Sequence, residues 1–238
     1  MRLHDLILGL LAFVAELVGV LSGFGSSTFF VPAALLIEKA QFVLALTGIL
    51  HCFGNIFKLF LFRAQFDGRL YWKLAFPAIL LTAVGAWVAT LYSGEVMERW
   101  LGGFLILVGA SSLARGNRML RAPRWVAYTL SALSGFSTGF VGTGGALRGL
   151  ALVSIGVPKE SFVAISSAVD IGGDFARTSI YLTHGFMDWS QWFYLPVLGA
   201  AAYGGARVGQ RLLSRIPQAQ FERIVALCIV LAGFAMLF

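Results

Sequence analysis

Apolar stretches of about twenty residues recur along the chain, separated by short polar or glycine-rich segments. A helix rises about 1.5 Å per residue, so each stretch is long enough to cross a hydrocarbon core of roughly 30 Å. The pattern predicts long helices at 3–22, 41–63, 70–92, 97–114, 125–138, 159–183, 189–212 and 218–238. Shorter helices are predicted at 26–37 and 144–156. The predicted fold class is all-α, in a polytopic membrane protein.

The composition supports this prediction. Of 238 residues, 58% are hydrophobic and 12% are charged, which is too apolar for a soluble domain of this length. The stretch 3–21 is too long for the apolar core of a signal peptide and lacks a clear cleavage site, so it is interpreted as the first membrane helix. Cys52 and Cys228 lie in apolar segments without metal-ligand spacing. We therefore expect no disulfide framework, no metal site and no cofactor.

The net charge of +7 is concentrated in three regions, which contain Arg63, Arg69 and Lys73; Arg115, Arg118, Arg121 and Arg124; and Arg207, Arg211 and Arg215. The turns at 92–98 and 181–190 carry no lysine or arginine. This asymmetry is typical of the excess of positive charge in cytoplasmic loops. It is favoured over a basic surface for nucleic acid, and no nucleic-acid partner is expected. Arg2, which this orientation places outside, is a mild exception.

An internal repeat divides the chain. LSGF occurs at 21–24 and again at 133–136. A shift of 119 residues aligns the polar series Thr47, His51, Asn55 and Lys58 with Ser166, Asp170, Asp174 and Arg177. The predicted organisation is an N-terminal repeat at 1–114, an arginine-rich cytoplasmic loop at 115–124 and a C-terminal repeat at 125–238. Five helices per repeat is an odd number, so the two repeats would have inverted topology, as in many secondary transporters.

Each repeat opens with a glycine-rich break, which predicts a broken or re-entrant helix pair. Non-helical backbone at membrane depth is tolerated only where it is buried in protein or lines a cavity. A half-helix that begins there offers its unpaired N–H groups, and the positive end of its dipole, to an anion. The candidate substrate-binding residues in the breaks are Gly25, Ser26, Ser27, Gly142, Gly144, Gly145 and Arg148. The alternative is that the glycines only permit close helix packing, as we expect for Gly204, Gly205 and Gly209.

The repeated polar series forms a stripe, because spacings of four, four and three residues lie on one helical face. His51 lies near the predicted bilayer midplane, where polar groups are costly and mark a transport pathway. The stripe adds His51, Asn55 and Lys58 as candidate substrate-binding residues, and His51, Asp170, Asp174 and Arg177 as candidate proton-coupling residues. Two structural alternatives remain open: in one, Asp174 serves only to neutralise Arg177, and in the other, Lys58 extends only to the cytoplasmic interface. Glu16 is a further buried carboxylate without a counterpart in the second repeat.

The two breaks, LSGFGSSTFFVPAALL and GFVGTGGALRGLALV, resemble the TauE/SafE family of anion transporters, and the resemblance covers the whole chain. It implies transport of sulfite, or of sulfonates such as sulfoacetate, across the cytoplasmic membrane of a bacterium. The first break has Gly25-Ser26-Ser27 where the family usually has Gly-x-Gly-Gly-Gly.

The expected function is therefore secondary transport of a small anion by alternating access, coupled to protons. The anion would lie between the two breaks, held by backbone N–H groups, serine hydroxyls, and Lys58 or Arg148. A passive anion channel of the same architecture is the alternative. A hydrolase is disfavoured by the lack of an H-E-x-x-H motif, and a cation transporter would depend on Asp170 and Asp174.

The first prediction concerns topology: both termini lie outside the cytoplasm and the 115–124 loop lies inside. A cysteine introduced by Asn117→Cys should resist an impermeant thiol reagent in intact cells, because the membrane separates the two. A cysteine placed in the 181–190 turn serves as the accessible control. Ready labelling at position 117 with none in that turn would reverse the orientation.

Overall fold

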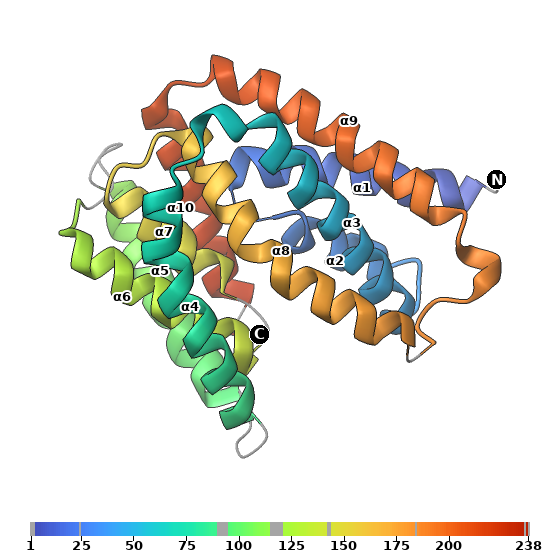
Figure 1. Ribbon diagram of the computed structural model, residues 1–238, viewed down its shortest axis with the longest axis horizontal. Helices are drawn as coiled ribbons and strands as arrows, with labels where there is room; N and C mark the ends of the chain where they lie inside the picture. Colours follow the sequence, from blue (N-terminus) through green and yellow to red (C-terminus); the bar gives the residue numbers. More distant parts are fainter. Residues whose placement is uncertain are drawn as a thin grey trace. The chain divides into compact units, whose positions relative to one another are not determined.

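The computed structural model describes residues 3–23, 25–89, 95–114, 121–141, 144–183, 185–235 and 237, and within these ranges all regular structure is helical. The α-helices are α1 (Leu3–Ser22), α2 (Ser27–Leu35), α3 (Ala40–Leu61), α4 (Gly68–Ala89), α5 (Glu95–Ala114), α6 (Arg124–Val141), α7 (Gly145–Ser154), α8 (Lys159–Thr183), α9 (Tyr194–Arg215) and α10 (Gln218–Ala235) (Figure 1). Two 3-10 turns, Arg63–Gln65 and Trp189–Gln191, precede α4 and α9. The all-α class is confirmed.

The helix bounds follow the sequence prediction closely. Helices α1 and α8 have the predicted bounds, and the short helices α2 and α7 each begin one residue after the predicted start. Helix α9 differs, because it begins at Tyr194 rather than at 189 and follows the 3-10 turn Trp189–Gln191. Pro196 then falls in the first turn of α9, where a residue without an N–H group leaves no helical hydrogen bond unmade.

The helices group into two compact units that do not coincide with the predicted repeats. The first unit contains 1–65 and 163–215, and the second contains 66–162 and 216–238. Each unit therefore takes helices from both sequence halves: α1, α2 and α3 group with α9 and most of α8, while α4 and α5 group with α6, α7 and α10. The repeats at 1–114 and 125–238 stay a prediction about sequence and topology, and they are not the packing units.

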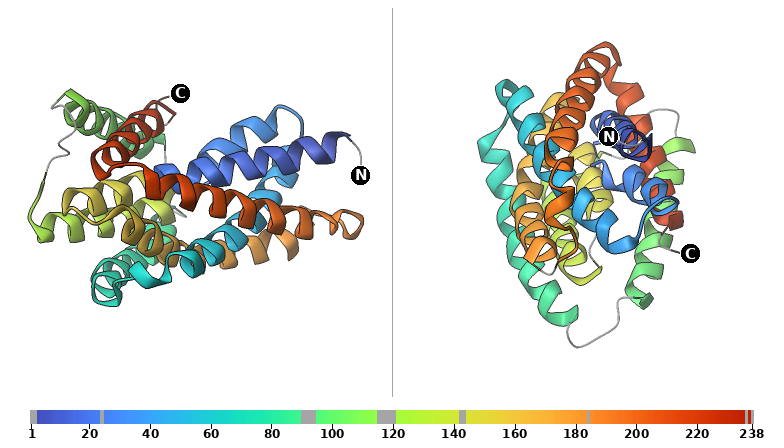
Figure 2. Two further views of the ribbon diagram at one scale, coloured as in Figure 1. Left: turned by 90° about the horizontal axis from the view of Figure 1, so that it is seen from above. Right: turned by 90° about the vertical axis from the view of Figure 1, so that its right-hand side faces the viewer.

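In the first unit, α9 packs along both α1 and α3, and α2 packs against α1 and α3. The side-by-side course of α1 and α9 can be followed in Figures 1 and 2. Glycines allow this contact: a Cβ atom on Gly205 would lie 2.6 Å from the carbonyl oxygen of Phe13, and one on Gly209 would lie 2.8 Å from Cβ of Val20. The packing role expected for Gly205 and Gly209 is confirmed.

Apolar side chains from α1, α2, α3 and α9 fill the core of this unit, among them Leu8, Phe30, Leu46, Leu50 and Leu198, which are fully buried. Close to the N-terminal end of α1, the hydroxyl of Tyr194 donates a hydrogen bond of 2.6 Å to Asp5 Oδ1. This bond connects the first turn of α9 to α1, so the α1–α9 contact includes one satisfied buried polar pair.

In the second unit, α4 and α6 approach so closely that backbone meets backbone. A Cβ atom on Gly135 would lie 2.0 Å from the carbonyl oxygen of Ala78, and one on Gly85 would lie 2.2 Å from that of Phe136. Hydroxyl groups connect the same two helices, with Ser131 donating to Leu74 O at 2.9 Å and Thr82 donating to Gly135 O at 3.1 Å. Small residues combined with hydroxyl hydrogen bonds are the usual means of helix association in a membrane.

The repeated LSGF sequence does not mark equivalent positions, and this corrects one indicator of the repeat. The first LSGF ends α1, which stops at Ser22, whereas the second, at 133–136, lies inside α6, which continues to Val141. These two copies are 112 residues apart, whereas a shift of 119 carries the end of α1 from Ser22 to Val141 and the start of α3 from Ala40 to Lys159. The polar stripe, and not LSGF, gives the register that the helix bounds follow.

The outer faces of the helices are apolar. Trp72 and Phe76 of α4, Trp100 and Leu107 of α5, and Leu10 of α1 are all more than half exposed. Extensive exposed apolar surface of this kind is rare on soluble monomers and suits contact with lipid. Among the described helices, His4–Ser22 and Gln41–Leu61 combine the length and the hydropathy of a membrane span.

We predict that Gly135→Ala destabilises the protein, because the new methyl group would meet a backbone carbonyl that cannot rotate away. Overpacking of this kind costs roughly 1–3 kcal/mol or more. The apparent melting temperature of the purified protein in detergent measures the effect. Gly103→Ala is the matched control, since nothing lies within 4 Å of its Cβ position. An unchanged melting temperature for Gly135→Ala would contradict the close α4–α6 contact.

Candidate functional site

The break between α1 and α2 is a turn that glycine makes possible. Gly23 and Gly25 have φ values of 73° and 93°, in the left-handed region that L side chains disfavour. Ser26 follows as the residue before α2, and Ser27 is the first residue of the helix. Nine residues of helix extend over about 14 Å, less than half of a hydrocarbon core of roughly 30 Å. Helix α2 is therefore too short to cross a bilayer.

His51 of α3 binds the N-terminus of α2. The backbone N–H of Ser27 donates to His51 Nε2 at 2.9 Å. A nitrogen that accepts a hydrogen bond carries no proton, so the proton of the neutral ring belongs on Nδ1, 3.5 Å from Asp174 Oδ1. A Cβ atom on Gly25 would lie 3.2 Å from His51 Cε1, so a glycine at this position also gives the imidazole room.

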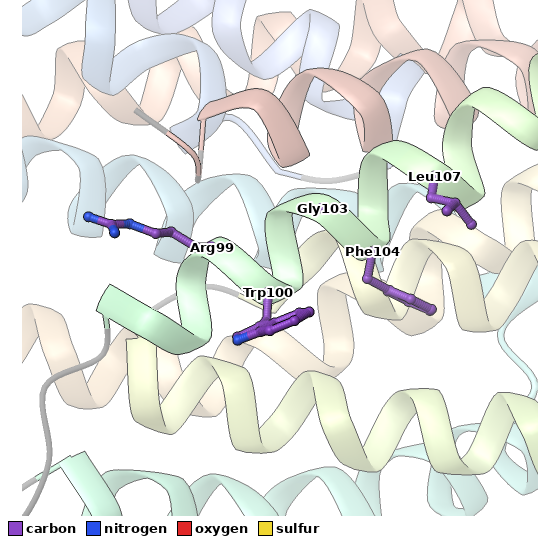
Figure 3. Close-up of a pocket in the computed structure, with 5 residues that line it drawn as sticks. All are labelled: Arg99, Trp100, Gly103, Phe104 and Leu107. Carbon is purple, nitrogen blue, oxygen red and sulfur yellow. The ribbon is translucent and has the colours of Figure 1, made fainter.

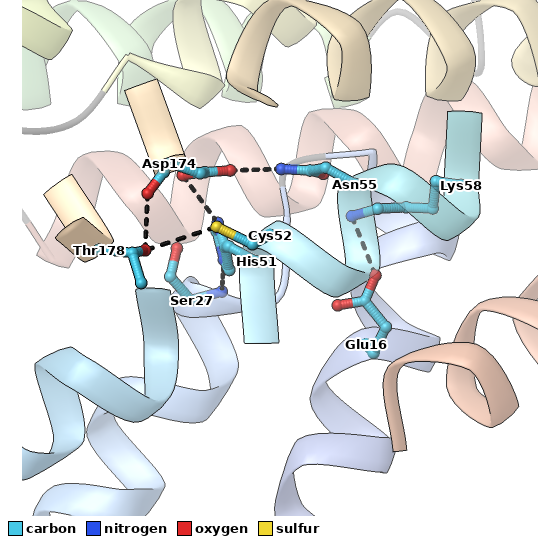
Figure 4. Close-up of polar contacts among 8 residues, drawn as sticks. All are labelled: Glu16, Ser27, His51, Cys52, Asn55, Lys58, Asp174 and Thr178. Carbon is cyan, nitrogen blue, oxygen red and sulfur yellow. Dashed lines mark hydrogen bonds and ion pairs between the residues drawn. The ribbon is translucent and has the colours of Figure 1, made fainter. Parts of the chain in front are cut away.

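Asp174 of α8 joins this cluster from the opposite side. Its Oδ2 accepts a hydrogen bond of 2.5 Å from Asn55 Nδ2, while its Oδ1 faces His51 (Figure 4). Thr178, one turn further along α8, lies 3.5 Å from the thiol of Cys52 and donates to the carbonyl oxygen of Asp174. Both carboxylate oxygens of Asp174 therefore face polar groups of α3.

Lys58 and Glu16 form a second buried pair within the same unit. Lys58 Nζ lies 3.0 Å from Glu16 Oε1, and the side chains are only 4% and 0% exposed (Figure 4). The contact is an ion pair, and within the described part of the chain neither Glu16 oxygen accepts a hydrogen bond. The interface alternative for Lys58 therefore does not describe this conformation, in which its ammonium group is buried beside a carboxylate.

The side chain of Ser26 lies in an unusual environment for a hydroxyl group. The residue is fully buried, caps no N–H group, and its Oγ has no hydrogen-bond partner among the described residues. Other hydroxyls nearby are bonded: Thr47 donates to the carbonyl oxygen of Val43 at 2.6 Å, and Ser166 donates to that of Gly23 at 3.3 Å. The N-terminus of α2 therefore holds a buried hydroxyl group that no atom of the described residues binds.

The second break lies in the other unit and has its own packing. Gly144 precedes α7, and a Cβ atom there would lie 2.2 Å from the carbonyl oxygen of Ser134. Ser134 Oγ in turn donates to Gly144 O at 2.8 Å. Gly145 begins α7 and Arg148 is buried in its first turn, with 5% exposure. Close packing alone thus explains the glycine at position 144.

The structure brings together most, but not all, of the candidates from the sequence. Gly25, Ser26, Ser27, His51, Asn55, Lys58 and Asp174 all lie in the first unit, with Asp170 half-buried one turn before Asp174. Gly142 lies outside the described residues, as does the side chain of Arg177, so its pairing with Asp174 stays a prediction. Sequence reasoning missed the partnership of Glu16 with Lys58 and the contact of Cys52 with Thr178. For the Glu16–Lys58 pair, the available signal was an acidic residue within one apolar helix and a basic residue within a neighbouring one.

Comparison with protein families now adds to this geometry. Residues 8–236 match the family described as Sulfite exporter TauE/SafE. The chain belongs to this family. Searches of curated proteins and of solved structures each returned no match. The TauE/SafE family consists of membrane anion exporters, so the protein is a membrane transporter, and its candidate site is a cluster of polar groups inside a membrane protein.

This TauE/SafE protein also has a hollow of about 740 Å³ along α5, lined by Arg99, Trp100, Gly103, Phe104 and Leu107 (Figure 3). The lining residues come from one face of one helix, and Trp100 and Leu107 are among the most exposed apolar side chains. None of the candidate site residues lines it. We interpret this hollow as part of the outer apolar surface and not as the anion site.

We predict that neutral His51 carries its proton on Nδ1, which is opposite to the tautomer that free histidine prefers. Nitrogen-15 NMR of histidine-labelled protein at alkaline pH measures this directly. The double variant His4→Asn/His184→Asn leaves His51 as the one histidine and so assigns the signal. A proton found on Nε2 would show that the Ser27 N–H does not donate to the ring.

Proposed function

We propose that this TauE/SafE protein is a proton-coupled secondary transporter of sulfite or a sulfonate such as sulfoacetate, acting by alternating access in the bacterial cytoplasmic membrane. The anion would bind at the N-terminus of α2. The observation that carries this proposal is the hydrogen bond from the Ser27 N–H to His51 Nε2 beside the unpartnered, fully buried hydroxyl of Ser26.

The donors at this position fit an oxyanion. The first N–H groups of a helix have no partner within the helix, and the helix dipole adds a partial positive charge there. Ser27 gives its N–H to a side chain of another helix, and within the described part of the chain no atom bonds to the Ser26 hydroxyl. A sulfonate or sulfite oxygen can accept both bonds, which a neutral ligand without acceptors cannot do. In this proposal His51 occupies the acceptor position until the anion arrives.

His51 also supports proton coupling. A proton added to Nε2 removes the lone pair that accepts the Ser27 N–H bond, so the N–H is released next to a new positive charge. An anion satisfies both groups at once, while Asp174 keeps its place beside Nδ1. Proton binding and anion binding would therefore favour each other, and such coupling is reciprocal by thermodynamic necessity.

Two observations support the inverted repeats, which many alternating-access transporters use. Asn55 and Asp174 are equivalent under the 119-residue shift, and their side chains bond to each other. Equivalent residues meet in this way next to a two-fold axis. The same shift also relates the observed starts of α3 and α8 and the observed ends of α1 and α6. Rocking of one repeat against the other is the transport step that such symmetry permits.

The break before α7 is proposed as the equivalent anion-contacting element of the second repeat. Helix α7 has ten residues and, like α2, is too short to span a bilayer. Arg148 is buried one turn from its start, where a guanidinium group can bind an oxyanion with two hydrogen bonds. We propose no catalytic role for any of these residues, and the protein is therefore proposed not to be an enzyme.

We predict that Ser26→Ala weakens anion binding but does not destabilise the protein. One neutral hydrogen bond contributes about 0.5–1.5 kcal/mol, so the affinity should fall roughly two- to tenfold. The empty protein loses no bond, because Ser26 Oγ has no partner there, and its apparent melting temperature should stay unchanged or rise. Ser131→Ala is the matched control: it removes a hydroxyl that donates to Leu74 O, so it should lower the melting temperature and spare binding.

Binding is measured by calorimetry in detergent with sulfite, sulfate, sulfoacetate, taurine and acetate. The proposed function fails if the wild-type protein binds none of these anions. In proteoliposomes, a saturable flux that requires protons distinguishes a transporter from a passive channel, whose flux would rise in proportion to concentration. Equal affinity of the wild-type and Ser26→Ala proteins would remove the α2 N-terminus from the site.

A further inference from the structure

The Glu16–Lys58 pair lacks what a purely structural buried ion pair needs. Taking two charges out of water is costly, and close approach offsets this cost only when further hydrogen bonds satisfy the remaining lone pairs. Lys58 Nζ lies 3.0 Å from Glu16 Oε1, but among the described residues no group donates a hydrogen bond to either Glu16 oxygen. The ionised carboxylate is thus compensated by a single ammonium group.

Two glycines form the walls around this carboxyl group. A Cβ atom on Gly54 of α3 would lie 2.6 Å from Cδ and from both oxygens of Glu16, and one on Gly205 of α9 would lie 3.0 Å from Glu16 Cβ. The space therefore fits a carboxyl group closely and offers it no side-chain donor from these two positions. When Glu16 binds a proton, it loses its electrostatic attraction to Lys58 and no other bond is broken.

Other ionisable groups on α1 and on the helices packed against it have partners of their own. Helix α2 carries no titratable side chain within its bounds, and α9 faces Glu16 with Gly205, while Arg207 of α9 is exposed and bonds to Gln210. The other ionisable residue of the polar stripe on α3 is His51, and it faces Asp174 of α8. On α1 itself, Asp5 accepts from Tyr194. Lys58 is thus the charge whose state depends directly on Glu16.

We propose that Glu16 is a proton-binding residue of the transport cycle and that its protonation releases Lys58 to the substrate anion. This rests on the proposed function, together with the sequence-based expectation that Lys58 binds the anion. In the empty state Glu16 is the counter-ion of Lys58. When Glu16 takes up a proton it becomes a neutral carboxylic acid, and the oxyanion becomes the counter-ion instead. One proton and one singly charged anion enter together, so the total charge of Glu16, Lys58 and the anion stays at zero.

Asp174 is less suited to this exchange. Its Oδ2 accepts from Asn55 and its Oδ1 faces the Nδ1 proton of His51. A proton on Asp174 would have to displace one of these donors, whereas a proton on Glu16 displaces only the ammonium group that must be released. The proposal assigns to Asp174 the positioning of His51, and to Glu16 the exchange of a proton for an anion at Lys58.

The test compares anion binding to the wild-type and Glu16→Gln proteins by calorimetry in two buffers of different ionisation enthalpy, over a series of pH values across neutrality. The anion is the tightest binder from the panel above. Glutamine imitates the protonated acid, so Glu16→Gln should take up about one proton fewer per anion. Where Glu16 of the wild type is ionised, the wild-type affinity should fall about tenfold per pH unit relative to that of the variant. Glu38→Gln is the matched control and should behave like the wild type, because Glu38 lies in the turn after α2, partly exposed and facing His4.

Lys58→Gln completes the design, and it should lose roughly ten- to a hundredfold in affinity because a charge-assisted bond is removed. A wild-type protein that binds no anion contradicts the proposed function itself. A wild type that binds, with Glu16→Gln retaining the same proton uptake and pH dependence, overturns the role of Glu16 and leaves the proposed function intact.

Infrared difference spectroscopy tests the proposal on the wild-type protein, so the result does not depend on whether a variant folds. Adding the anion should create the C=O stretching band of a protonated carboxyl group. Glu16→Asp, which keeps the carboxyl group on a shorter side chain, should shift that band. If the wild type binds the anion and no such band appears, Glu16 is not protonated on binding and the proposal is wrong.

Discussion

The first unit depends on one constraint: a charge buried in a membrane protein must be compensated by another protein group, because no water is present to solvate it. Helix α3 brings Lys58 and the ionisable ring of His51 into the interior, and in both cases the carboxylate comes from a different helix. Glu16 lies on α1 and Asp174 lies on α8. Removing either acid would leave its partner uncompensated, so these pairs also determine which helices must stay next to α3.

The same constraint explains where glycine is needed. Polar partners on separate helices reach each other only if backbones approach closely, and a methyl group at Gly54 would occupy the space of the Glu16 carboxyl group. At Gly25 the absence of a side chain allows both the left-handed turn and the approach of the His51 ring. The glycines of the first break and of α3 therefore serve the polar cluster, whereas Gly205 and Gly209 chiefly serve the α1–α9 contact.

The sequence could predict the helices and the stripe, because both depend on local spacing. Apolar length and glycine position placed the starts of α2 and α7 to within one residue, and the period of the polar residues placed His51, Asn55 and Lys58 on one face. It could not predict partners, since these depend on which helices pack together. Glu16 and Lys58 lie on different helices, 42 residues apart in the sequence, so their spacing along the chain does not pair them, and Asp174 reaches His51 from the other half of the sequence. LSGF misled for a related reason: the same four residues end α1 but continue α6, where tertiary contacts hold Gly135 in the helix.

Internal counter-ions also bear on the choice between a carrier and a channel. A carrier that works by alternating access must return through its cycle without substrate, and buried donors of an empty anion site would then lack acceptors. His51 Nε2 and the Glu16 carboxylate supply acceptors for the Ser27 N–H and for the Lys58 ammonium group, the two donors that the anion is proposed to use. Their competition lowers the affinity for substrate, which a carrier tolerates because it must also release the anion. In a permanently open, hydrated pore, water accepts hydrogen bonds from the donors, so internal acceptors such as His51 Nε2 are not needed. The acceptors already present for the Ser27 N–H and for Lys58 are therefore consistent with the proposed carrier.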